Sequence, residues 1–208
     1  MKTSLALLIM LMCACQLFAQ TQKGSFMIGG NGSLNFDKNT YDGIGTYKTT
    51  SFSLSPVGGY FIINNLSAGL SLPFSQHWSR TDYDNVEDSE SNSISIGVAP
   101  FVRYYIPVKS FFIVTEVSYS WNHSKLDYPM YDGSGGIVGR DETTYNSRYF
   151  KVAAGPAFFL NPYTSIEILA NYQRYAYSSD TPAIDSQMNF YISVGFQIYL
   201  PSGKPRME

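Results

Sequence analysis

The chain has 208 residues, of which 44% are apolar, 16% are aromatic and only 14% are charged. This composition excludes a disordered chain, and 2 cysteines are too few for a disulfide scaffold. The 14 basic and 16 acidic residues leave a formal net charge of -2, so no cationic stripe is available to bind nucleic acid. The length suits one domain that encloses a single core or a single barrel.

The N-terminus has the pattern of an export signal. Lys2 supplies the positive start, and residues 5–15 form an apolar stretch that fits a signal peptide but is too short to span a bilayer. We predict cleavage after Ala19, which makes residues 1–19 the signal peptide.

The alternative is a lipoprotein acylated on Cys15, which Ala14 precedes, although Met12 and Cys13 fit a lipobox poorly. With cleavage after Ala19, both cysteines leave with the signal. The mature chain then has no thiol for disulfides, nucleophilic catalysis or metal binding.

Apolar and polar residues alternate through most of the mature chain. In the last segment one face is Met188, Phe190, Ile192, Val194, Phe196, Ile198 and Leu200, and the other carries Asn189, Tyr191, Ser193, Gly195, Gln197 and Tyr199. A period of two predicts strands with two different faces. The predicted strands are residues 24–36, 49–61, 66–80, 92–105, 111–124, 145–160, 165–177 and 187–200.

The connections alternate in length along the chain. Tight turns are expected at 62–65, 106–110 and 161–164, and long loops at 37–48, 81–91, 125–144 and 178–186. Short turns at one end and long loops at the other predict an all-β, eight-stranded, antiparallel up-and-down barrel over residues 20–200. Both termini are expected at the short-turn, periplasmic end, where residues 201–208 form a short tail.

Three prolines form a weak internal repeat. Pro56, Pro100 and Pro156 each precede a short turn by five or six residues. A closed barrel has no free edge on which a missing N–H is harmless, so we expect β-bulges or water at these positions.

The composition of the polar face distinguishes a membrane barrel from a soluble lipocalin-like carrier. A soluble barrel would expose a surface with about 25–35% charged residues. The polar face here is mostly Ser, Gly, Asn and Ala, which suits the narrow interior of an eight-stranded barrel, while the apolar face suits hydrocarbon. We therefore predict a transmembrane β-barrel, with a soluble secreted carrier as the alternative.

Aromatic residues are predicted to form two interfacial belts, as membrane barrels require. The belt near the short turns comprises Tyr60, Phe61, Tyr104, Phe111, Phe158, Tyr163 and Tyr199. The belt near the long loops comprises Phe36, Trp78, Trp121, Tyr145, Tyr175 and Tyr177.

The last strand and two hairpins carry a family resemblance. Residues 193–200, SVGFQIYL, are similar to the C-terminal signal read by the outer-membrane assembly machinery, although the tail extends beyond it. With the hairpin segments SPVGGYF and GVAPFVRYY, the chain resembles the small outer-membrane β-barrel domain family of Gram-negative bacteria. The resemblance implies an outer-membrane location, with outer-membrane lipids, lipopolysaccharide and the barrel assembly machinery as partners. It implies no catalytic activity.

Four charged residues fall on the predicted inner face: Arg103, Glu116, Lys151 and Glu167. Arg103 and Glu116 are expected as diagonal neighbours about 7 Å apart, close enough for an ion pair. We interpret the cluster as a structural plug of the lumen, in which opposite charges satisfy one another. The alternative is a narrow proton or ion path.

A lipid esterase is the enzymatic alternative. His77 and Ser79 share a face of one predicted strand, and Glu90 could orient the histidine. His77 falls on the lumen face rather than toward lipid, and His123 and its neighbour Ser124 point to opposite faces. We therefore predict no catalytic residues.

The remaining polar segments are interpreted as solvated loops. Asp82, Asp84, Glu87, Asp88 and Glu90 have no neighbouring base in the predicted loop, and their spacing is not that of a calcium loop. The glycine-rich residues 133–136 lack the features of a phosphate site. We expect no metal or cofactor, and a non-enzymatic barrel whose loops present a binding surface for an unidentified extracellular ligand.

Overall fold

The computed structural model describes residues 21–41, 45–83, 88–132, 136–177 and 187–202, and nearly all of them lie in antiparallel strands. No helix in these ranges is long and apolar enough to cross a membrane. The strands are β1 (Phe26–Tyr41), β2 (Gly45–Ile63), β3 (Leu66–Ser71), β4 (Phe74–Tyr83), β5 (Ser89–Val108), β6 (Phe111–Tyr131), β7 (Ile137–Asn161), β8 (Thr164–Tyr177) and β9 (Gln187–Leu200).

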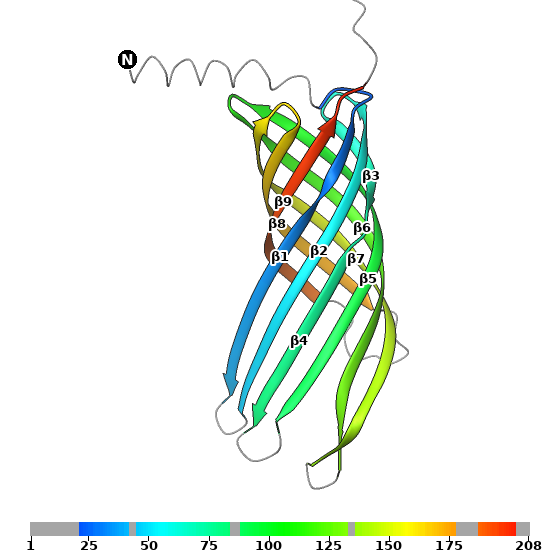
Figure 1. Ribbon diagram of the computed structural model, residues 1–208, viewed down its shortest axis with the longest axis vertical. Coiled ribbons are helices and arrows are strands. Elements are labelled where there is room, and N and C mark those ends of the chain that lie inside the picture. The colour runs from blue at the N-terminus through cyan, green and yellow to red at the C-terminus, as the bar shows by residue number, and fades with distance from the viewer. Residues whose placement is uncertain (1–20, 42–44, 84–87, 133–135, 178–186, 203–208) are drawn as a thin grey trace, which may run out of the picture.

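These strands close into a ring (Figure 1). Each strand pairs with its chain neighbours, and β1 also pairs with β9, from Phe26 opposite Leu200 to Gly32 opposite Val194. β3 and β4 are one strand interrupted at Leu72 and Pro73, because their pairings with β2 and with β5 keep a single register across the break. The prediction of an eight-stranded antiparallel up-and-down barrel is confirmed.

The outer and inner faces of the sheet have the predicted polarity. Phe190 is 80% exposed on the outer face, whereas Ser193 and Gln197 on the inner face are 5% and 0% exposed. The outer face is apolar over its whole circumference, as contact with hydrocarbon requires, and the inner face is polar. The soluble carrier is therefore not supported.

The expected bulges at the three prolines are absent. The β5–β6 ladder pauses between Val98 and Phe101, around Pro100, and resumes in the same register. The β7–β8 ladder does the same between Ala154 and Ala157, around Pro156. Pairing lapses locally, so the missing N–H is accommodated without an extra residue. The register shifts instead lie beside turns, at Phe61/Ile63, Met130/Tyr131 and Phe159/Asn161.

Three of the predicted long loops are largely strand. β1 and β2 stay paired to Tyr41 opposite Gly45, and β6 and β7 to Tyr131 opposite Ile137, so residues 37–48 and 125–144 are mostly ladder. β4 and β5 are paired through Thr81 opposite Ser89. These hairpins extend well past the short strand ends of β8 and β9 (Figure 1).

The extended hairpins were not predicted because both of their faces are exposed, as in residues 140–146 of β7, where every side chain is exposed. Without a lipid side and a lumen side, their residues need not alternate, and the period-two signal disappears. Cross-strand ion pairs stabilise them instead, including Lys125 with Glu142 (2.7 Å) and Arg140 with Asp127 (2.6 Å). The interiors of the predicted loops at 81–91 and 178–186, and residues 133–135, lie largely outside the described residues.

The opposite end of the barrel is short and compact. Two-residue turns join β2 to β3, β5 to β6 and β7 to β8, and Asn65 in the first turn has a positive φ of 65°. The N-terminal residues fold onto this turn, where Asn65 N donates to Thr21 O (2.6 Å) and Lys23 N donates to Asn64 Oδ1 (2.9 Å). Both ends of the described chain lie at this short-turn end (Figure 1). The predicted signal peptide, residues 1–19, and most of the tail lie outside the described residues.

The aromatic belts are partly as predicted. Tyr60, Tyr104 and Phe158 are exposed on the outer face near the short turns, as are Phe36, Trp78 and Trp121 toward the other end. Tyr163 is exposed in the β7–β8 turn itself. The assignment was wrong for Phe61 and Tyr199, which are fully buried in the lumen, and for Tyr145 and Tyr175, which line an interior cavity. All four have inward parity, which decides the direction of a side chain more reliably than its distance from a turn.

Candidate functional site

The lumen has three layers, of which two are filled by side chains and the third is a cavity. At the short-turn end, apolar and aromatic side chains pack into one cluster: Met27, Val57, Phe61, Phe101, Tyr105, Phe112, Val114, Ala153, Ala157, Leu169 and Tyr199, with Phe159 against it. The rings of Phe61, Tyr105 and Tyr199 lie 5.7–6.2 Å apart between centroids. This layer fills the lumen at the short-turn end.

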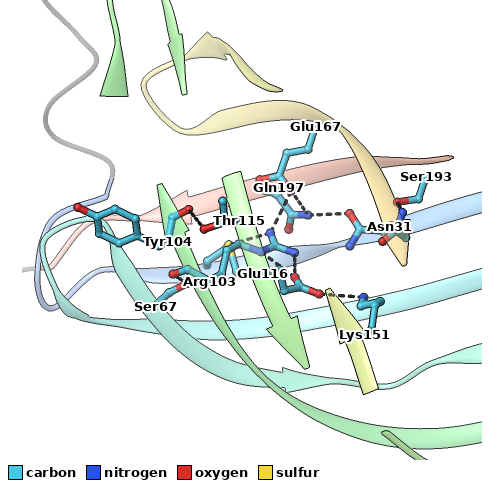
Figure 2. Close-up of polar contacts among 12 residues, drawn as sticks. Asn31, Ser67, Arg103, Tyr104, Thr115, Glu116, Lys151, Glu167, Ser193 and Gln197 are labelled. Atoms are coloured by element: carbon cyan, nitrogen blue, oxygen red, sulfur yellow. Dashed lines mark hydrogen bonds and ion pairs between the residues drawn. The ribbon is translucent and has the colours of Figure 1, made fainter. Parts of the chain in front are cut away.

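The second layer is the predicted group of four charges, which the structure brings together (Figure 2). Arg103 Nη1 lies 3.0 Å from Glu167 Oε2, and its Nε donates to Glu116 Oε2 at 2.9 Å. Lys151 Nζ lies 2.8 Å from Glu116 Oε1. Two cations and two carboxylates thus form a continuous chain across the lumen, which we call the charge cluster.

The relation between Arg103 and Glu116 differs from the prediction in one respect. The two residues are directly opposite in the β5–β6 ladder rather than diagonal. The β5–β6 turn contains only two residues, Lys109 and Ser110, which sets the register two residues away from the predicted one. Direct pairing on the same face brings the side chains within hydrogen-bonding distance.

Neutral polar groups supply the remaining hydrogen bonds to the Glu167 carboxylate. Its Oε1 accepts from the hydroxyls of Tyr105 (3.1 Å) and Tyr199 (3.3 Å), and its Oε2 accepts from Gln197 Nε2 (3.3 Å). Arg103 also lies over the ring of Phe101, at 5.4 Å from the centroid. A buried charge is tolerated when it is paired and hydrogen-bonded, and both conditions are met here.

These partners of Glu167 were not predicted, although the parity of their positions directs them into the lumen. Tyr105 continues the inward series of Arg103, and Tyr199 continues that of Gln197. The assignment of Tyr199 to an interfacial belt concealed its inward direction.

The third layer is an open cavity of about 620 Å³ between the charge cluster and the long hairpins. Its wall is mostly Ser, Asn and Tyr, and reaches Asp37 and Tyr145 toward the hairpin tips. His77 lies in this wall, and its Nδ1 is 2.8 Å from Ser51 Oγ.

The proposed esterase residues are not brought together. Ser79 Oγ contacts Tyr47 Oη (3.0 Å) and Thr49 Oγ1 (3.3 Å) rather than His77. Glu90 lies on the outer face, where its Oε1 accepts from Arg80 Nη1 at 3.2 Å. His123 likewise lies outside, 3.0 Å from Asn146 Oδ1, whereas Ser124 faces the lumen.

The described acidic residues of the segment 82–90 are paired with basic side chains, contrary to the prediction. Arg80 contacts Asp82 (2.6 Å), Asp88 (2.9 Å) and Glu90 (3.2 Å), and Lys48 contacts Asp82 (2.6 Å). Lys48 lies on β2 and Arg80 on β4, and the prediction had considered only the residues from 81 onward. Hydrogen bonds from Lys48 and then Arg80 hold the pKa of Asp82 below its usual value. Asp84 and Glu87 lie outside the described residues, and within the described ranges no group of His, Asp or Glu is arranged to hold a metal.

The chain is similar to several solved structures at low sequence identity. Neisserial surface protein A is 15% identical (85% of this chain and 97% of that chain covered, TM-score 0.42). OprG from Pseudomonas aeruginosa is 10% identical (88% and 99% covered, TM-score 0.49), and Ail of Yersinia pestis is 14% identical (86% and 100% covered, TM-score 0.43). No curated protein matches the chain.

One protein family matches most of the chain. Residues 4–202 match the family described as "Outer membrane protein beta-barrel domain", which covers almost the whole sequence. The chain therefore belongs to the outer membrane protein beta-barrel domain family, and with it to the outer membrane.

Proposed function

We propose that this protein is a non-enzymatic barrel whose lumen is closed to solutes, and which serves envelope structure or recognition at the cell surface. The observation that carries the proposal is that side chains fill the lumen at the short-turn end. The charge cluster and the aromatic layer beneath it occupy the axis with side chains that bond to one another. An eight-stranded barrel is just wide enough for side chains to fill.

The charge cluster favours a plug over an ion path. Each cation contacts at least one carboxylate, and Glu167 is surrounded by hydroxyl and amide donors. A permeating ion would have to break these contacts in a medium of low polarity, which is costly.

The orientation we propose follows from the asymmetry of the two ends. The short-turn end, with both chain ends, faces the periplasm, and the long hairpins face the exterior. The predicted signal peptide, residues 1–19, directs export, the assembly machinery inserts the barrel, and lipids and lipopolysaccharide surround it. The hairpins then present a rigid surface for recognition.

Flux measurements in liposomes test the closed lumen. Liposomes that contain the heat-modifiable, folded barrel should retain small sugars and ions as well as empty liposomes do. The combined variant Phe61→Ala and Tyr105→Ala, which removes rings from the aromatic layer, should leak. The matched control, Tyr60→Ala and Tyr104→Ala, removes the adjacent rings from the lipid face and should stay sealed. Conductance by the wild-type barrel would overturn the proposal.

Two further measurements address location and catalysis. Cell fractionation with protease accessibility of the hairpins should place the protein in the outer membrane with the hairpins outside. Incubation with phospholipid should give no ester hydrolysis. Turnover that disappears in His77→Ala would establish an esterase instead.

A further inference from the structure

We propose that the cavity above the charge cluster is a binding site for a neutral saccharide. The inference deepens the recognition role proposed above and places the ligand inside the barrel mouth rather than on the loops alone. The cavity volume of about 620 Å³ is within the range of small-ligand sites, roughly 300–1,000 Å³.

The cavity has two chemically different walls. One wall is lined by hydroxyl groups from β2, β4 and β5: Ser51, Ser53, Ser55, Ser75, Ser93 and Ser95. The other wall, from β7, β8 and β9, carries the four tyrosines Tyr145, Tyr149, Tyr175 and Tyr191. A sugar has hydroxyl groups at its edge and C–H groups on its face, so one wall can exchange hydrogen bonds while the other packs against the ring.

One amide, that of Gln173, holds two of the four tyrosines of this wall. Tyr175 Oη donates to Gln173 Oε1 at 2.9 Å, and Gln173 Nε2 donates to Tyr191 Oη at 3.0 Å. The rings of Tyr149 and Tyr175 lie 5.1 Å apart between centroids. Tyrosines fixed in this way lose little side-chain entropy on binding, which favours affinity.

A buried donor in the cavity wall lacks a partner. Asn122 is 8% exposed, and its Oδ1 accepts from Ser120 Oγ at 3.0 Å. Its Nδ2 has no hydrogen-bond partner among the described residues. Gly97, opposite it in the ladder, leaves room for this amide, since a Cβ there would lie 2.9 Å from Asn122 Cγ. This nitrogen has almost no accessible surface, so a ligand acceptor would pair with it once the Asn122 amide turns toward the cavity.

The charges argue against an ionic ligand. The described lining residues include one carboxylate, Asp37, which is exposed at the rim, and neither lysine nor arginine. The polar wall also disfavours an apolar ligand, because its hydroxyl groups would be left unpaired. Uncharged polyhydroxylated molecules are the class that fits both walls.

Such a sugar could arrive free or attached to a lipid. The β1–β9 pairing ends at Gly32 opposite Val194, and Phe36 and Phe190 on either side of this seam border both the cavity and the lipid face. The cavity therefore adjoins the bilayer as well as the exterior.

Binding should be measured on the folded full-length barrel in a zwitterionic detergent, because maltoside detergents carry the proposed chemistry themselves. The probes are maltotriose, cellotriose and chitotriose, with sialyllactose as an anionic comparison and a short alkyl alcohol as an apolar one. We expect saturable calorimetric or NMR binding of at least one neutral trisaccharide, weaker binding of sialyllactose and none of the alcohol. A second arm presents the same sugars on a lipid anchor in nanodiscs, and binding there alone would assign the ligand to a glycolipid.

Matched variants locate the site. Tyr149→Ser combined with Tyr175→Ser, and separately Gln173→Leu, should weaken binding at least tenfold. Tyr60→Ser and Tyr104→Ser, on the lipid face, should leave it unchanged, and heat-modifiability on gels verifies that each variant is folded.

The saccharide site is overturned if no neutral trisaccharide binds saturably in either arm, or if binding is insensitive to the lumen variants. These outcomes are distinct from failure of the closed-barrel proposal. Leaky liposomes with intact sugar binding would overturn only the seal, and sealed liposomes without sugar binding would overturn only the site.

Discussion

Arg103 on β5 and Glu167 on β8 meet inside the barrel with Nη1 and Oε2 3.0 Å apart, and both side chains are 0% exposed. Two strands separate β5 from β8 in the ring, so this contact ties distant parts of the wall to each other. The charge cluster thereby acts as an internal brace as well as a plug.

Removal of the central cation should therefore be strongly destabilising. Arg103→Met leaves Glu167 buried without a cation, and breaking a buried pair in this way costs about 3–5 kcal/mol. Urea unfolding of the barrel in liposomes should show this loss. Arg140→Met breaks an exposed pair with Asp127 and should cost about 0–1 kcal/mol. Equal losses for the two variants would contradict the brace.

Glycine is required at position 69, where the barrel wall is crowded. A Cβ at Gly69 would overlap Gly58 O and lie 2.6 Å from Gly59 Cα and 2.8 Å from the Phe101 ring. Gly69→Ala should lower the free energy of unfolding by about 1–3 kcal/mol through overpacking. Gly58, on the outer face of the paired strand, has open space around its missing Cβ, and Gly58→Ala should change stability by less than about 0.5 kcal/mol. The same unfolding assay compares the two.

Two outer-face residues of almost equal exposure should respond differently to charge. Ile192 is 66% exposed near the middle of β9, and Val138 is 64% exposed in the extended β6–β7 hairpin. Ile192→Lys should destabilise the barrel by about 2–4 kcal/mol, because a lysine near the bilayer midplane is costly. Val138→Lys should have almost no effect if that hairpin stands in water. A similar loss at both positions would mean that the membrane boundary is misplaced.

The carboxyl of Asp82 should titrate below the usual range in the folded protein, because hydrogen bonds from Lys48 and Arg80 favour its charged form. A lowered folded-state pKa means that the stabilisation is present above the unfolded-state pKa and is lost as the pH falls through the folded-state pKa. Carboxyl NMR of the labelled barrel should show this low midpoint, and Lys48→Met should raise it. An unchanged midpoint in Lys48→Met would show that the contact in the β2–β4 ladder is not formed.

The membrane-embedded part of the fold was predictable because two environments act on each strand. Residues such as Ile192 and Ser193 differ in polarity only because one meets lipid and the other meets the lumen. The same parity located Arg103, Glu116, Lys151 and Glu167 on one inner surface. Which of them touch required the turn length and the ring closure, which a single strand does not reveal.

The extended hairpins and the cavity were not predictable from alternation. Lys48 and Asp82 are joined by a ladder contact between segments that each read as loops. The tyrosine wall depends on Gln173 bridging Tyr175 and Tyr191 from neighbouring strands, a relation between side chains that sequence spacing does not encode.

The β6–β7 ladder keeps one register from Phe112 opposite Ala157 to Met130 opposite Gly139, and this has a practical consequence for protein engineering. Since side chains alternate strictly, adding one residue to each arm of the β6–β7 hairpin near its tip lengthens it while every earlier pair, such as Lys125 opposite Thr144, keeps its partner and orientation. Adding one residue to a single arm within the ladder would turn the rest of that arm inside out. The reach of this protein beyond the bilayer can thus be adjusted in matched steps, independently of the part that lipid constrains.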